Sequence, residues 1–341
     1  MKTPPRPLVL LGLGAASALV LSGCASTTSD ATSDSETDAI TVVASTNVYG
    51  QIAEEIGGDL VEVTSIVTNA AQDPHSFEAS ARDQLTVEQA DLVIENGGGY
   101  DSFMDSLVEA SGSEAHVITA AEFSHSWPTE EGEEDHSDHD HDEEDEEHSD
   151  EEEHSDEDDH AGHDHIEGFN EHVWYDPHTM AYVADAIAEE LGEISPDDAE
   201  TFTANAEAFH EEIEGLEESL EEVAAAHVGE EAFLTEPVGG YLVIAAGLED
   251  VTPAEFSEAV EEGQDVAPAT LLEALSIITD GDLSVMITNT QTGGAETEQV
   301  VAEAENEDVP VVAFSETLPE GQTYISWMQE NIENLAAALD S

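Results

Sequence analysis

Four polar residues lie just after predicted strands or in the loops beyond them. His75 and His172 come from the first half of the chain, and Glu236 and Glu316 from the second half. In open α/β sheets, ligands bind outside the carboxyl ends of the strands. Two imidazoles and two carboxylates suit zinc, manganese or ferrous iron. A cation held by all four would connect the two halves.

Each of the four residues also has an ordinary interpretation. His75 in an Asp-Pro-His sequence fits a turn, and His172 beside Trp174 fits a packed surface histidine. Glu236 and Glu316 fit the acidic first turn of a helix, which the helix dipole favours. Residue type and spacing alone therefore leave the metal site and these interpretations open.

A tract rich in histidine and acid lies between the two histidines. The tract runs from His136 to His165, and of its thirty residues eight are histidine and seventeen are Asp or Glu. It has no apolar periodicity, so we expect a disordered loop spanning about 126–168. Acidity alone does not call for so many imidazoles, so we expect an accessory loop that captures metal. Its histidines are His136, His139, His141, His148, His154, His160, His163 and His165.

The N-terminus has the pattern of a lipoprotein signal. Lys2 and Arg6 precede an apolar stretch at 8–21, which is too short to span a bilayer comfortably. The sequence Leu-Ser-Gly-Cys that follows ends at Cys24, the only cysteine, and resembles a bacterial lipobox. We expect a signal peptide at 1–23, a lipid anchor on Cys24 and a flexible tether at 24–38. The protein would then be extracytoplasmic and anchored to the cell membrane.

The charge of the chain is extreme. Only three residues are Lys or Arg, against 83 Asp or Glu, and Arg82 is the only basic one outside the predicted signal. Nucleic acid is excluded as a partner, because nothing neutralises phosphate. Self-repulsion opposes the compact state, and concentrated salt would relieve it. A saline habitat explains such a composition.

Strands and helices alternate in two regions, at 39–194 and 229–341, which predicts two α/β lobes with parallel sheets flanked by helices. The predicted strands are at 40–44, 61–67, 91–95 and 116–118, then at 232–235, 284–288 and 309–314. Between the regions, 195–228 predicts one amphipathic helix of roughly 45 Å, suited to a spine that joins the lobes.

Several motifs occur in a specific combination. They are Asp73-Pro74-His75 followed by Phe77-Glu78, His172-Val173-Trp174 with Asp176-Pro177, a predicted helix containing Tyr241 after Glu236, and an acid after the strand that ends at Phe314. From about Ile40 to the C-terminus, apart from the tract, the chain resembles the cluster A-I metal-binding lipoproteins. These are the solute-binding components of zinc and manganese ABC importers.

The resemblance implies two pseudo-symmetric lobes, a rigid spine helix and one metal ligand on each of four loops. By position these ligands are His75, His172, Glu236 and Glu316. It also implies an ABC permease with its ATPase as partner and a binding protein that is not an enzyme. We expect a monomer.

The choice of metal rests on two opposing features. Zinc-binding members usually have histidine five residues before the helix tyrosine, whereas this chain has Glu236 there, like the manganese-binding members. Zinc-binding members often carry a loop rich in histidine and acid before the second histidine, where the tract lies. We expect Zn²⁺, with Mn²⁺ as the alternative. Glu255 and Glu296 are lower-ranked substitutes for the ligands of the second lobe.

Other functions are also compatible with parts of the sequence. A zinc hydrolase would need an open metal position, and no pair of ligands occurs on one helix as in His-Glu-x-x-His. A surface adhesin or a metal buffer without a permease is not separated from a receptor by sequence. The segment 289–294 follows a predicted strand, and it fits support of the ligands and a plain turn about equally.

Overall fold

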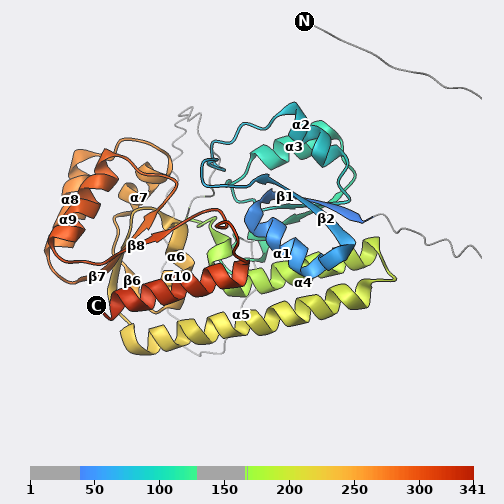
Figure 1. Cartoon of the computed structure of the whole chain (residues 1–341). Coiled ribbons are helices and arrows are strands. Elements are labelled where there is room, and N and C mark those ends of the chain that lie inside the picture. Colours follow the sequence, from blue (N-terminus) through green and yellow to red (C-terminus); the bar gives the residue numbers. More distant parts are fainter. Residues whose placement is uncertain (1–38, 129–165, 167) are drawn as a thin grey trace, which may run out of the picture. The chain divides into compact units, whose positions relative to one another are not determined.

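The computed structural model describes residues 39–128, 166 and 168–341, and residues 39–341 group as one unit. Figure 1 shows two parallel sheets, each flanked by helices. In each sheet, the second strand in chain order lies at one edge and is followed by the first, the third and the fourth. The predicted fold class, two pseudo-symmetric α/β lobes, is confirmed.

The first lobe is built on a short sheet that is covered by helices. Its strands are β1 (Ile40–Thr46), β2 (Val61–Val67), β3 (Leu92–Glu95) and β4 (His116–Thr119), and its helices are α1 (Asn47–Gly57), α2 (Ala81–Glu88), α3 (Phe103–Ser111) and α4 (Pro177–Ile194). The central strands β1 and β3 are almost entirely buried. Their runs of β-branched and apolar residues suit strands that are covered on both faces.

The second lobe repeats this arrangement with one very short edge strand. Its strands are β5 (Glu231–Leu234), β6 (Glu249–Asp250), β7 (Leu283–Asn289) and β8 (Val311–Phe314), and its helices are α6 (Gly240–Ala245), α7 (Ala254–Glu261), α8 (Pro268–Thr279), α9 (Ala295–Asn306) and α10 (Tyr324–Leu339). The sequence did not predict β6, because two residues carry no periodicity.

Helix α5 (Ala199–His227) joins the two lobes and is the predicted spine. Seven of its residues are buried at three- and four-residue spacing: Phe202, Ala206, Phe209, Ile213, Leu216, Leu220 and Val223. It packs against α1 and α4 of the first lobe and against α6 and α10 of the second. One continuous apolar core includes residues of both sheets and of α5. Such a core resists a wide hinge motion between the lobes.

No helix in the described part of the chain is long and apolar enough to cross a membrane.

Candidate metal centre

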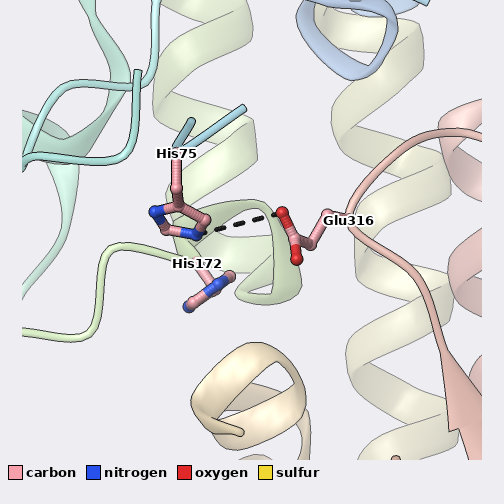
Figure 2. Close-up of side chains that lie close together, drawn as sticks. All are labelled: His75, His172 and Glu316. Carbon is pink, nitrogen blue, oxygen red and sulfur yellow. Dashed lines mark ion pairs between the residues drawn. The ribbon is translucent and has the colours of Figure 1, made fainter. Parts of the chain in front are cut away.

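The structure brings His75, His172 and Glu316 together, with one ligand atom of each inside a group no more than 4.8 Å across. Figure 2 shows His75 facing Glu316 of the second lobe, with His172 close to His75. The Nε2 atom of His75 lies 3.9 Å from Oε2 of Glu316. Two atoms that each lie about 2.1 Å from one zinc ion are at most about 4.2 Å apart, so this separation suits a shared ion.

A turn and an aromatic ring position His75. Asp73 Oδ1 accepts a hydrogen bond from the His75 backbone N–H at 3.0 Å, which fixes the Asp-Pro-His turn. The edge of the imidazole packs against Tyr100, with ring centroids 4.8 Å apart. Tyr100 lies in the loop after β3, at the carboxyl end of the sheet. A loop at the carboxyl end of the sheet therefore helps to orient His75.

His172 is oriented by Asn170. Asn170 Oδ1 accepts from the His172 backbone N–H at 3.0 Å and from its ring Nδ1 at 2.8 Å. Since a carbonyl oxygen only accepts, Nδ1 carries the hydrogen and Nε2 keeps the lone pair that a metal needs. Asn170 is held in turn by the second lobe, because its Nδ2 donates to the Pro237 carbonyl and its own carbonyl accepts from the Tyr241 hydroxyl.

Glu316 is buried and held by donors from both lobes. Its Oε1 accepts from Asn289 Nδ2 at 2.6 Å, and its Oε2 accepts from the Tyr100 hydroxyl at 3.3 Å. Its backbone N–H donates to Gln291. Burial, together with the nearby acids, raises the pKa of Glu316 to about 8. A divalent ion would lower this pKa by favouring the charged carboxylate.

Glu236 lies beside this group, and both of its oxygens are engaged. Oε2 accepts from Asn289 Nδ2 at 2.8 Å, and Oε1 accepts a short hydrogen bond from the Thr292 hydroxyl. Burial is the main cause that raises the pKa of Glu236. Among the described residues it belongs to none of the groups with ligand atoms within 4.8 Å. Its role as a ligand therefore stays a prediction.

The segment 289–294 supports both carboxylates. Asn289, the last residue of β7, donates to Glu236 and Glu316 together. Gln291 Oε1 accepts from the backbone N–H groups of Glu316 and Thr317. In the described structure the segment is thus tied to the acids by hydrogen bonds and is more than a plain turn.

Two further buried acids face the histidines, and the sequence analysis missed them. Glu171 Oε1 lies 4.0 Å from Nδ1 of His75, and Glu261 Oε1 lies 3.8 Å from Nε2 of His172. His75, Glu171 and Glu261 form a second group within 4.8 Å. The position of Glu171 next to His172 was an available signal. Glu261, at the end of α7 and far along the chain, had none.

Several acids gather around the two histidines, and no Lys or Arg lies among them in the described part of the chain. Burial, followed by repulsion from Glu171, Glu236 and Glu316, raises the pKa of Glu261 to about 9. Arg82 is the only Lys or Arg in the described part of the chain, and it is exposed. A buried set of acids and imidazoles with no fixed counter-charge suits a cation.

The remaining predicted residues are not part of this centre as described. Glu255 and Glu296 belong to none of the candidate metal groups among the described residues. Cys24 and the eight histidines of the tract lie outside the described residues.

The chain is similar to a family of known metal-binding proteins. The sequence profile of the family "ZnuA: Zinc-uptake complex component A periplasmic" matches residues 42–338. The chain belongs to this family, which consists of solute-binding proteins of ABC transporters and not of enzymes. The predicted family is confirmed, and so is the prediction that the protein is not an enzyme. The family works with an ABC permease and its ATPase.

Individual relatives are named for different metals. The manganese-binding lipoprotein MntA of Halalkalibacterium halodurans is 24% identical over 328 residues, covering 94% of this chain and 95% of that protein. The zinc-binding lipoprotein AdcA of Streptococcus pneumoniae is 24% identical over 85% of this chain, which spans only 54% of that longer protein. The periplasmic zinc-binding protein TroA of Treponema pallidum has the same fold, with a TM-score of 0.66, 18% identity, and coverage of 88% of this chain and 99% of that one.

Proposed function

We propose that this protein is a lipid-anchored extracytoplasmic receptor that binds one zinc ion between its lobes and delivers it to an ABC permease with its ATPase. The observation that carries the proposal is the convergence of His75 and His172 from the first lobe on Glu316 from the second. The family membership supports transport as the purpose of this binding.

The proposed ligands are His75, His172, Glu236 and Glu316. The His172 lone pair on Nε2 and the carboxylate oxygens supply donors, and two carboxylates neutralise the charge of a divalent ion. Glu236 would bind the ion through an oxygen that accepts a hydrogen bond from Asn289 or Thr292 in this structure. Because the spine and continuous core resist a wide hinge, we expect closure by a small movement.

Zinc is preferred because of the histidine tract and the two imidazoles in the folded site. Manganese is the second candidate, favoured by the acids Glu236 and Glu316 and by the resemblance to a protein named for manganese. The test is a competition titration of the two ions on a variant whose eight tract histidines are replaced by asparagine. The proposal predicts that zinc displaces manganese at equal concentration. Displacement of zinc by manganese would assign the receptor to manganese.

The tract is proposed to bring metal near the folded site, and Cys24 to hold the protein at the membrane. A Cys24→Ser variant should appear in the medium instead of the membrane fraction. Metal uptake by cells that lack the protein should be restored by the wild type and not by His75→Ala. Failure of the wild type to restore uptake would favour an adhesin or a metal buffer over a receptor for import, and full restoration by His75→Ala would contradict the role of His75.

A further inference from the structure

Helix α7 places an acid against the metal centre from the second lobe. Glu261 is its last residue, and the Glu261 side chain is only 11% exposed. The other acids of this helix, Glu255 and Glu258, and Glu262 just after it are exposed. The apolar residues Phe256 and Val260 anchor the helix in the core of the lobe. The position of Glu261 is therefore fixed by packing.

Glu261 and His172 lie close enough together to bind the same ion. Glu261 Oε1 lies 3.8 Å from Nε2 of His172, which is the ring atom that keeps its lone pair because Nδ1 donates to Asn170. That distance is below the roughly 4.2 Å that two donors of one ion can span, given metal–ligand bonds of about 2.1 Å. It also equals, within 0.1 Å, the separation between His75 and Glu316.

Glu261 differs from Glu236 in what its oxygens contact. Both oxygens of Glu236 accept hydrogen bonds, from Asn289 and Thr292. Oε1 of Glu261 is buried and accepts no hydrogen bond from the described part of the chain. A structural role for a buried carboxylate normally includes donors to its oxygens. The Glu261 oxygen instead faces the imidazole nitrogen and the neighbouring acids.

We infer that Glu261 supplies a further ligand oxygen to the ion held by His75, His172 and Glu316. The inference rests on the proposed function, since it concerns the same ion. Together with the proposed ligand Glu236, this oxygen gives the centre five donors, one more than the four that a structural zinc ion takes. Manganese accepts more ligands and favours oxygen donors. Glu261 is thus the residue that lets the site hold manganese as well as zinc.

The test compares Glu261→Gln with Glu262→Gln in the full-length protein. The two changes replace the same carboxyl group by an amide at adjacent residues, but Glu262 is exposed. Trp174 packs against His172 with ring centroids 5.2 Å apart, so its fluorescence reports occupation of the folded centre separately from the tract. A Trp174→Phe background identifies this signal. Manganese and zinc are titrated separately against each variant.

For Glu261→Gln we expect manganese affinity to fall by roughly tenfold or more, since loss of even a supporting partner costs 10–100-fold, and zinc affinity to fall less. Glu262→Gln should match the wild type. If Glu261→Gln binds manganese as tightly as Glu262→Gln does, the inference is overturned while the proposed receptor stands. If the wild type gives no saturable Trp174 response to either ion, both are overturned. Thermal melts of the metal-free variants, expected to equal the wild type or exceed it, show that a lost affinity is not lost folding.

Discussion

Asn289 connects two acids of the metal centre by hydrogen bonds. Its single amide donates to Glu236 and Glu316, two acids that come from different loops of the second lobe. Without this donor, two buried carboxylates would face each other with no group between them. Such a pair is costly, because desolvation and like-charge repulsion both oppose ionisation.

Asn289→Ala should therefore weaken binding of zinc without removing a ligand. We expect a loss of roughly 10–100-fold in affinity, the range typical for partners that orient metal ligands. Isothermal titration of the protein with its tract histidines replaced would measure it. Asn306→Ala, at an exposed position on α9, is the matched control. An affinity unchanged by Asn289→Ala would show that the two acids do not need this amide.

Glu95 offers a pH test at the end of β3. Burial, followed by repulsion from Asp101, Asp105 and Glu122, raises its pKa from 4.5 to about 8, although the hydrogen bond from the Thr119 hydroxyl lowers it in part. The folded protein thus holds this proton at pH values where the unfolded chain has lost it. The stability that it contributes is fully present below about pH 4.5 and is lost as the pH rises through about 8.

Glu95→Gln stays neutral at every pH and can still accept from Thr119. Its free energy of unfolding relative to the wild type should therefore increase from pH 5 to pH 9, by at least about 2 kcal/mol, because each unit of pKa difference is worth about 1.4 kcal/mol. Urea unfolding at constant high salt measures this, with exposed Glu114→Gln as control. If the free energy of unfolding changed with pH in the same way for Glu95→Gln and the wild type, the raised pKa of Glu95 would be contradicted.

At the scale of elements, the spine helix and the loop after β5 respond differently to an added methyl group. Gly215 lies in the exposed middle of α5, where a Cβ atom would meet nothing within 4 Å. Gly239 follows Glu236, and a Cβ atom there would lie 2.5 Å from Cδ2 of Phe314. Gly215 weakens helix α5, whereas Gly239 permits close packing against Phe314.

Gly215→Ala should raise the free energy of unfolding by roughly 0.5–1 kcal/mol, the helix propensity difference between the two residues. Gly239→Ala should lower it by roughly 1–3 kcal/mol, because it overpacks the contact with Phe314. Chemical denaturation of both variants gives the comparison. A destabilised Gly215→Ala would mean that the spine needs flexibility at this point.

The elements could be predicted far better than the centre. The periodicity of residues such as Phe209 and Ile213 located α5 almost to its ends, because a buried helical stripe repeats along the sequence. His75, His172 and Glu316 could be selected because each lies beyond a strand in an order known from a family. Glu261 and Asn289 could not be assigned these contacts, since they depend on how α7 and β7 pack in three dimensions.

At the scale of the whole molecule, the acidic surface should make folding depend on salt. Arg82 is the only basic side chain outside the first six residues, against 83 acids, so repulsion between acids has almost no compensation within the chain. Added salt screens this repulsion over distances that shrink to about 3 Å at 1 M.

The melting temperature should rise by roughly 5 °C or more between about 0.1 M and about 2 M KCl, since each kcal/mol of stability shifts it by about 2–4 °C in a protein of this size range. Differential scanning calorimetry of the metal-free protein gives the values. Potassium chloride is chosen because it is not a strongly stabilising salt. A melting temperature that stays flat across this range would contradict the account of the charge.

The central claim is that one ion is held in the folded centre and not by the tract. Its most direct test is the count of zinc ions that survive dialysis against a chelator, in the protein with all eight tract histidines replaced by asparagine, with and without His75→Ala. The account predicts one retained zinc ion without His75→Ala and none with it. One zinc ion still retained after His75→Ala would contradict the assigned centre.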